Sequence, residues 1–257
     1  MIARRTGLYI ATGCLTYVAA LIATFPAPWF SHVIEGISGQ TLALRDPAGT
    51  AWSGSGRLFV RQRSGEMLDL GVLHWDSSLS ATLAGKLAAD LRLGESATAV
   101  HLELSPASTT VRGLHLELPG QVLANIAPGL EALGPQGKIL IRSDSLRFDA
   151  NSILGLADVE WRPARLARAQ GLDLGSHVAR LRGGGRKIDI ELASIEGPLR
   201  LSGGGTWASD SGLIVSGAIE HGEDRSGMMT PFLQGVCSEY RPGRCAFRIT
   251  HQPAKGT

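Results

Sequence analysis

The sequence predicts a mainly β protein, in which one amino-terminal transmembrane helix precedes an elongated antiparallel β-sheet domain built from two similar units, with a few short helices. Two observations carry this prediction. Beyond residue 50, apolar and polar residues alternate with period two in many short runs, which is the pattern of strands with one buried face. Gly supplies 33 of the 257 residues and aromatic residues only 5%, a composition typical of short strands joined by turns.

The amino terminus predicts the helix that crosses the membrane. Arg4 and Arg5 precede an uncharged segment whose apolar centre, residues 7–25, is long enough to span a bilayer. The segment lacks the Ala-x-Ala site typical of signal-peptide cleavage, and the positive-inside rule keeps its basic end in the cytoplasm. We therefore expect residues 1–30 to form a cytoplasmic stub and an uncleaved signal anchor, with residues 31–257 on the far side. A cleaved signal peptide is the alternative.

The residues after the apolar centre predict where the anchor ends. Pro26 and Pro28 are expected to end the helix, because proline is poorly tolerated in a helix interior. Trp29 and Phe30 follow, and aromatic residues of this kind are enriched at the membrane interface.

Two of the three cysteines predict a disulfide. Cys237 and Cys245 flank the turn signal Arg-Pro-Gly, whereas Cys14 lies inside the anchor. Two cysteines that close a short loop on the oxidising side of a membrane are expected to pair. Two free buried thiols are the alternative. A zinc site is disfavoured, because His251 is the only further ligand nearby and tetrahedral zinc needs four.

The body of the chain divides into short strands with two short helices among them. Residues 98–104 and 113–120 alternate clearly, and similar runs recur toward the carboxyl end. Residues 79–93 predict a half-buried strand or strand pair, with a helix as the competing interpretation because leucine also recurs every fourth residue. Residues 120–126 and 226–233 predict short helices, since proline precedes the first and Ser226 can cap the second.

A faint internal repeat predicts the two similar units. Two stretches offset by roughly 80 to 86 residues each begin Gly-basic-apolar and each reach an apolar-x-Trp element, at Trp75 and Trp161. We expect units at about 50–130 and 131–225, followed by the disulfide-closed carboxy-terminal segment. Two antiparallel units joined end to end would bury one continuous face.

The stretch GTAWSGSGRL, residues 49–58, contains one tryptophan among three glycines. It lacks the Gly-Lys-Ser/Thr end of a phosphate-binding loop and the third glycine of the dinucleotide fingerprint. In a solvated linker, the large apolar side chain of Trp52 would have nothing to pack against. We therefore predict a bent edge region of sheet in which Trp52 packs inward, while Gly49, Gly54 and Gly56 allow bulged or positive-φ conformations.

At these residues the sequence resembles the type II secretion system protein N family of Gram-negative bacteria. The short anchor and the later order of elements around Trp75 and Trp161 follow the family over nearly the whole chain up to about Leu172. The family's Gly-Thr-x-Trp-Ser-Gly signature is matched by Gly49, Thr50, Trp52, Ser53 and Gly54. The sequence departs from the family after Trp75, where no proline follows, and the segment holding Cys237 and Cys245 has no counterpart in the resemblance.

The resemblance implies an accessory inner-membrane component of the type II secretion system, a scaffold that assists export of folded proteins across the outer membrane. It implies a single-pass protein of the bacterial inner membrane, with its amino end cytoplasmic and its main domain periplasmic. The implied partners are other inner-membrane components of the system and the outer-membrane secretin.

No enzyme, cofactor or metal site is predicted. The seven histidines are scattered without a metal-binding HExxH motif or a nucleophile elbow, and the net charge of +2 gives no case for nucleic acid. The run Arg182–Lys187, RGGGRK, is interpreted as a hairpin turn in preference to an anion site. Two other classes stay open: a membrane-anchored periplasmic protein that binds or transfers lipid on a curved apolar sheet, and a hydrolase of unknown site.

Overall fold

The computed structural model describes residue 17 and residues 24–78, 86–94, 98–126, 128–222, 227 and 229–251. Among these residues, no helix is long and apolar enough to cross a membrane. Most of the expected anchor, and the first part of the run at 79–93, fall outside them. The chain forms two compact units: one extends to Glu95 and the other starts at Ser96, with residues 62–66 grouped with the second.

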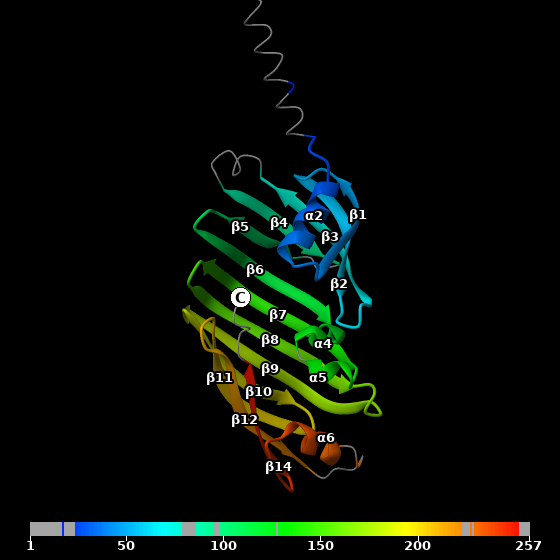
Figure 1. Cartoon of the computed structure of the whole chain (residues 1–257), viewed down its shortest axis with the longest axis vertical. Helices are drawn as coiled ribbons and strands as arrows, with labels where there is room; N and C mark the ends of the chain where they lie inside the picture. The colour runs from blue at the N-terminus through cyan, green and yellow to red at the C-terminus, as the bar shows by residue number, and fades with distance from the viewer. Residues whose placement is uncertain are drawn as a thin grey trace, which may run out of the picture. The chain divides into compact units, whose positions relative to one another are not determined.

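The first unit is an antiparallel sheet with a helix against one of its faces (Figure 1). Its four strands are hydrogen-bonded in chain order, and each is antiparallel to the next. Its elements are α2 (Pro28–Ile37), β1 (Leu42–Gly49), β2 (Ser53–Arg61), β3 (Met67–Ser77) and β4 (Leu87–Leu93). The run at 79–93, where strand and helix competed, is therefore a strand over its described second half.

A short helix, α2, begins at one of the two prolines that are expected to end the anchor, and the end of the anchor helix itself stays a prediction. Pro28 is the first residue of α2, a position where proline is favoured, because the backbone N–H it lacks would have no intrahelical partner. Ile34 on this helix packs against a core that includes Leu44, Leu58 and Trp75. The helix is therefore held by the sheet of its own unit, which sequence periodicity at the membrane boundary did not reveal.

The second unit is an antiparallel sheet whose strands follow chain order until the last two, which are exchanged: β12 pairs β14, and β13 pairs only β14. Its strands are β5 (Val100–Leu104), β6 (Ser108–Pro119), β7 (Pro135–Asp149), β8 (Ile153–Leu166), β9 (Leu172–Gly185), β10 (Lys187–Glu196), β11 (Leu199–Ala208), β12 (Gly212–His221), β13 (Glu239–Arg241) and β14 (Arg244–His251). Its helical segments are η1 (Gly120–Val122), α4 (Leu123–Ile126), α5 (Pro128–Glu131) and α6 (Met229–Val236).

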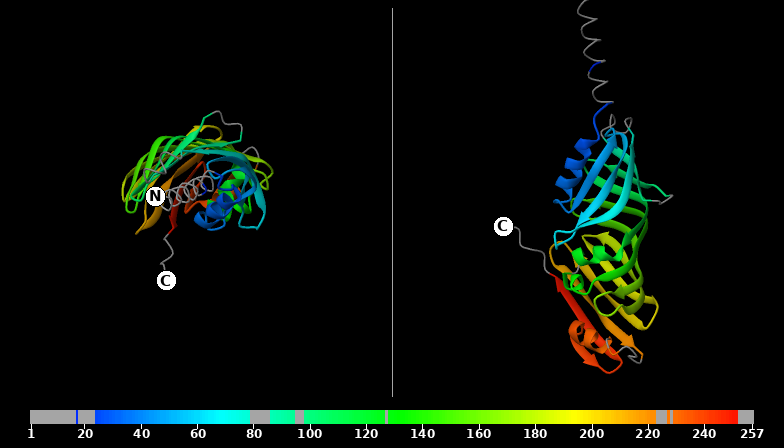
Figure 2. Two further views of the ribbon diagram at one scale, coloured as in Figure 1. Left: turned by 90° about the horizontal axis from the view of Figure 1, so that it is seen from above. Right: turned by 90° about the vertical axis from the view of Figure 1, so that its right-hand side faces the viewer.

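The core of the second unit lies at one end of its sheet. Leu166, Leu172 and Leu199, at the ends of β8, β9 and β11, pack around Leu233 of α6, and Leu130 of α5 packs against this cluster. The sheet curves, and α5 and α6 lie on its hollow side (Figure 2). Both short helices predicted from the sequence are present, with η1 and α4 covering residues 120–126 and α6 beginning at Met229.

The mainly β, antiparallel fold class is confirmed. The division into repeat units at 50–130 and 131–225, and the placement of 1–30 and 31–257 about a membrane, stay predictions.

Candidate functional site

The strand register of the second unit separates its side chains into two faces. In antiparallel sheets, residues directly opposite each other project to the same face, so one row can be followed from strand to strand. One such row contains no polar side chain and crosses eight strands: Leu116, Ile141, Val159, Ala179, Leu192, Gly203, Gly217 and Phe247. We call the face that carries this row the hollow face, because the core beneath α6 lies on it, and the opposite face the outer face.

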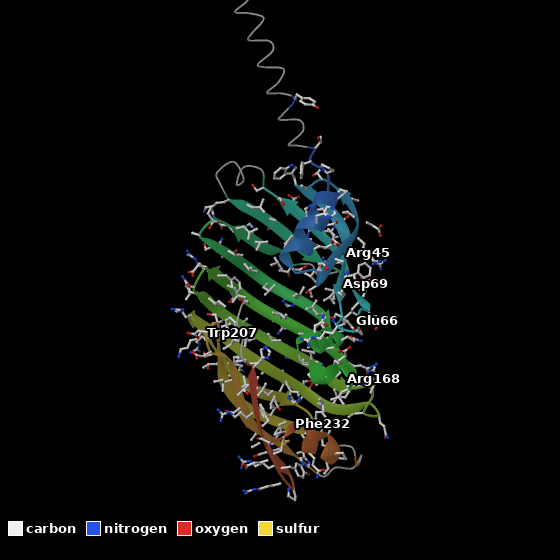
Figure 3. The ribbon with its side chains drawn as sticks, viewed as in Figure 1. Arg45, Glu66, Asp69, Arg168, Trp207 and Phe232 are labelled. Carbon is white, nitrogen blue, oxygen red and sulfur yellow. A yellow bond between two sulfur atoms is a disulfide. The ribbon has the colours of Figure 1, made fainter. Side chains whose placement is uncertain are left out.

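Two further rows of the hollow face are also almost entirely apolar. The first is Ala157, Leu181, Ile190, Gly205, Val215 and Ile249, and the second is Gly155, Gly183, Ile188, Trp207, Leu213 and His251. Both rows lie toward the strand ends remote from the α6 core, and Figure 3 places Trp207 of β11 well away from Phe232 of α6. Ile190, Trp207 and Leu213 are half-buried, and Ile249 is 51% exposed. This part of the face is therefore apolar without being a closed core.

Glycine residues shape the hollow face across β11 and β12. A Cβ built on Gly203 would lie 2.6 Å from the Ser216 carbonyl oxygen, and one on Gly205 would collide with the Ile214 carbonyl oxygen. A Cβ on Gly217 would lie 2.8 Å from Cε1 of Phe247. The neighbouring backbones approach so closely on this side that only glycine fits, and the Phe247 ring fills the space above.

The few polar side chains on the hollow face are satisfied inside the protein. The Ser143 hydroxyl donates to the Leu156 carbonyl oxygen at 2.5 Å. The Ser194 hydroxyl donates to the Leu199 carbonyl oxygen and accepts from the Leu201 N–H. His177 places one ring nitrogen 3.1 Å from the Ser194 hydroxyl and the other 2.9 Å from the Leu174 carbonyl oxygen.

Burial lowers the pKa of His177, and the hydrogen bond to the Leu174 carbonyl oxygen opposes that effect without cancelling it. A neutral ring is therefore favoured at neutral pH. None of the residues that the three rows above place on β7 to β12 carries a formal charge at neutral pH.

The outer face carries the charge. The ion pairs that join two described residues of the second unit lie on it: Glu103–Arg112, Glu117–Lys138, Arg142–Glu160, Arg162–Glu160, Arg180–Glu191 and Glu220–Arg244. All of them except Arg162–Glu160, which lies within β8, join neighbouring strands. Arg142, Asp158, Arg180 and Glu191 form one row of alternating sign across β7 to β10. Residues of the same four strands line a cavity of about 680 Å³. They include the four charged residues of this row and several apolar residues.

In the first unit, the Gly-Thr-x-Trp-Ser-Gly stretch forms the connection between β1 and β2. Gly49 has φ +97°, and the Thr50 hydroxyl accepts from the N–H groups of Trp52 and Ser53. The Ala51 N–H donates to the Phe25 carbonyl oxygen at 2.8 Å. The stretch is thus a hydrogen-bonded turn that also holds the segment leading into α2.

The deeply buried tryptophan of the first unit is Trp75, which is 2% exposed, whereas Trp52 is half-buried. A Cβ on Gly54 would lie 2.5 Å from Cζ2 of Trp75, so glycine at position 54 makes room for the indole. The Trp75 indole N–H donates to the Thr50 carbonyl oxygen at 3.0 Å. The signature residues and Trp75, which the sequence treated as separate elements, therefore form one packed structure.

Trp161 in the second unit makes the corresponding contact. Its indole N–H donates to the Gln136 carbonyl oxygen at 2.7 Å, and donor and acceptor are 25 residues apart, as they are for Trp75 and Thr50. Each of the two predicted marker tryptophans thus donates its indole N–H to a backbone carbonyl oxygen 25 residues earlier, within its own unit.

The two carboxy-terminal cysteines are joined. Cys237 and Cys245 form a disulfide with their Cα atoms 5.8 Å apart, and Cys245 is 1% exposed within the core beside Leu233. The bond connects the end of α6 to β14. Among the residues that the structure describes, no cluster of three or more His, Cys, Asp or Glu could hold a metal ion.

These features define an antiparallel β-sheet protein with one apolar and one charged face. The chain belongs to the family of type II secretion system protein N, whose family model matches residues 40–248. That family is an accessory component of secretion and is not a known family of enzymes. Comparisons with curated proteins and with solved structures return no match. The resemblance found at residues 49–54 is therefore confirmed at the level of the family.

Proposed function

We propose that this chain is a scaffold of the inner-membrane part of the type II secretion system, anchored by one amino-terminal helix with its sheet domain in the periplasm. The family match over residues 40–248 is the observation that carries the proposal. The Cys237–Cys245 disulfide supports an oxidising compartment. The basic pair Arg4 and Arg5 before the apolar run supports a cytoplasmic amino end.

The docking element of this scaffold is the free edge of β14. Strand β13 pairs with Arg244–Ala246 only, so the outer edge of residues 247–251 has no strand partner among the residues that the structure describes. A strand edge with unpaired N–H and C=O groups is a template for a further strand, and five residues match a typical strand length. Other inner-membrane components of the system and the outer-membrane secretin are the partners that this edge would serve.

The edge strand of the first unit is different. β1 contains a bulge between Arg45 and Ala48, with Asp46 at φ +50° and Pro47 beside it. A bulge and a proline without an N–H both prevent a further strand from pairing. Of these two strands, β14 is therefore the one suited to recruit a partner.

Deletion of the gene tests the role in secretion. Export of folded proteins by the type II pathway should fall, and it should recover when the chain is supplied in trans. Unchanged export, together with altered permeability of the outer membrane, would contradict the scaffold and favour a protein of lipid handling.

A photo-crosslinking amino acid tests the docking edge. Placed at Thr250 on β14, it should capture a protein of the secretion system in cells. The matched control is Thr206, which is exposed on the same face and lies two strands inward, in the row that joins Thr206, Ile214 and Thr250. Equal capture at both positions, or capture at Thr206 alone, would reject the β14 edge. An alkaline phosphatase fusion after Thr257 should be active if the topology is correct.

A further inference from the structure

The part of the hollow face remote from α6 presents apolar side chains that no closed core contains. Ile188, Ile190 and Leu192 of β10 are all half-buried, as are Leu181 of β9 and Leu213 of β12. The buried cluster of this unit gathers instead at the α6 end. Apolar surface left partly in water across several adjacent strands is the mark of a binding surface.

The chemistry of the occupant follows from the polar groups on this face. Ser143, His177 and Ser194 form their hydrogen bonds with other groups of the protein. The three rows expose no charged side chain before the rim at His251. A peptide laid on this face would lose hydration from its N–H and C=O groups without finding partners, which is costly. A hydrocarbon chain has no such groups, so its burial on this face carries no such desolvation cost.

The dimensions of the face fit a hydrocarbon chain. The row from Leu116 to Phe247 crosses eight strands, which at about 4.8 Å between strands is roughly 34 Å along the sheet. One acyl chain spans about 15 Å, half of the bilayer's hydrocarbon thickness. The glycines of β11 and β12 keep the floor of the face low, because at Gly205 and Gly217 a Cβ would collide with the neighbouring strand.

The rim beside these rows is cationic. Arg186 lies in the turn between β9 and β10, directly before Lys187, the first residue of β10, which projects to the outer face. Arg186 forms no ion pair within the part of the chain that the structure describes. Arg182 and Asp189 face each other in register, so the nearest carboxylate already has a cationic neighbour. Gly184 and Gly185 have open space around them, which leaves room for an anionic headgroup at the turn.

We propose that the hollow face of the second unit, along β8 to β12, binds the acyl chains of an acidic phospholipid, with the headgroup at Arg186. This inference rests on the geometry of the face and not on the scaffold role. Docking through β14 and lipid binding on the hollow face are compatible, and either proposal can be refuted without the other.

Trp207 provides a built-in reporter, because it lies on the hollow face beside Ile188. The full chain is reconstituted in vesicles of phosphatidylethanolamine and phosphatidylglycerol, with the phosphatidylglycerol carrying dibrominated acyl chains. Bromine quenches an indole only in close contact. Trp207 emission, obtained as the difference between the parent chain and Trp207→Phe, should be quenched in these vesicles and not in vesicles without bromine.

A pair of variants separates the two faces. Ile190→Glu places a carboxylate on the hollow face, where burial against hydrocarbon is unfavourable, and should weaken quenching of Trp207 about tenfold. Leu156→Glu is the matched control, since Leu156 is 60% exposed on the outer face and its replacement should change nothing. Ile249→Glu, at a 51% exposed position in the same row as Ile190, repeats the test if Ile190→Glu does not fold.

The headgroup is tested by charge reversal. Arg186→Glu should reduce quenching by brominated phosphatidylglycerol and leave quenching by brominated phosphatidylcholine unchanged. Absence of quenching of Trp207, or an equal effect of Leu156→Glu and Ile190→Glu, would overturn the proposal. A photo-crosslinker at Ile190 that captures protein in place of lipid would also overturn it, and would identify the face as a protein-binding surface.

Discussion

Replacement of Trp75 tests whether the signature stretch is a structural element. Trp75 is 2% exposed, rests on Gly54 and donates its indole N–H to the Thr50 carbonyl oxygen. Trp75→Ala removes the ring and leaves a cavity beside Leu44 and Leu58. Trp75→Phe keeps an aromatic ring and removes the donor.

The expected losses follow from these contacts. Trp75→Ala should cost about 3 to 5 kcal/mol of unfolding free energy, the usual range for a large aromatic side chain removed from a core. Trp75→Phe should cost about 1 to 3 kcal/mol, because the part-buried Thr50 carbonyl oxygen loses its donor. Typical domains have only about 5 to 15 kcal/mol of net stability, so the first unit should open far more often in the alanine variant.

Hydrogen exchange gives a local measurement of this loss. Amides of β2 and β3 should exchange faster in both variants, with a larger increase in Trp75→Ala than in Trp75→Phe. Amides of β9 and β10 should keep their protection. Trp161→Phe is the matched control, because it removes the same kind of indole donor in the second unit and should leave β2 and β3 unchanged. Unaltered protection of β2 and β3 in Trp75→Ala, with secretion lost, would refute the structural role and indicate a binding site.

Three further outcomes are expected. Without reductant one of the three cysteines should react with an alkylating agent in the unfolded chain, and with reductant all three; loss of the Cys237–Cys245 bond should cost about 2 to 3 kcal/mol on the chain-entropy model. Because burial lowers the pKa of His177, the unfolded chain takes up the proton more readily, so unfolding free energy should fall as the pH drops below about 6.5; His177→Gln should reduce this pH dependence in urea titrations. Gly217→Ala, which would drive a Cβ into Phe247 and the Ser202 carbonyl oxygen, should speed amide exchange in β12 and β14, whereas Ala at Gly222, with open space around it, should not.

The strands could be predicted because their two faces differ in polarity. In β10 the residues Ile188, Ile190 and Leu192 alternate with Asp189 and Glu191, and this alternation alone defines a strand. The same alternation does not tell whether a second layer covers the apolar side. The half-buried state of these residues could therefore be learned only from the structure.

Other features depend on contacts that no local pattern encodes. A bulge in β7 lies between Arg142 and Leu146, so Ile141 and Leu146 project to the same face although Leu146 is five positions further along the chain. Period-two reasoning places them on opposite faces. The choice of Trp75 over Trp52 as the buried indole likewise depends on Gly54 lying directly opposite it, a pairing between strands.

The charged outer face of the second unit helps to explain why its apolar face needs no second layer of protein. Exposed ion pairs such as Arg180–Glu191 each contribute little, about 0 to 1 kcal/mol, so they do not replace a core. They do align neighbouring strands, because opposite charges directly across a strand pair favour that register and a one-residue slip would move them to the apolar side. The sheet then holds its register through backbone hydrogen bonds and the outer face, while the core under α6 fixes one end. An apolar face whose register is secured elsewhere does not need a second layer of protein, and it is free to receive a hydrocarbon ligand.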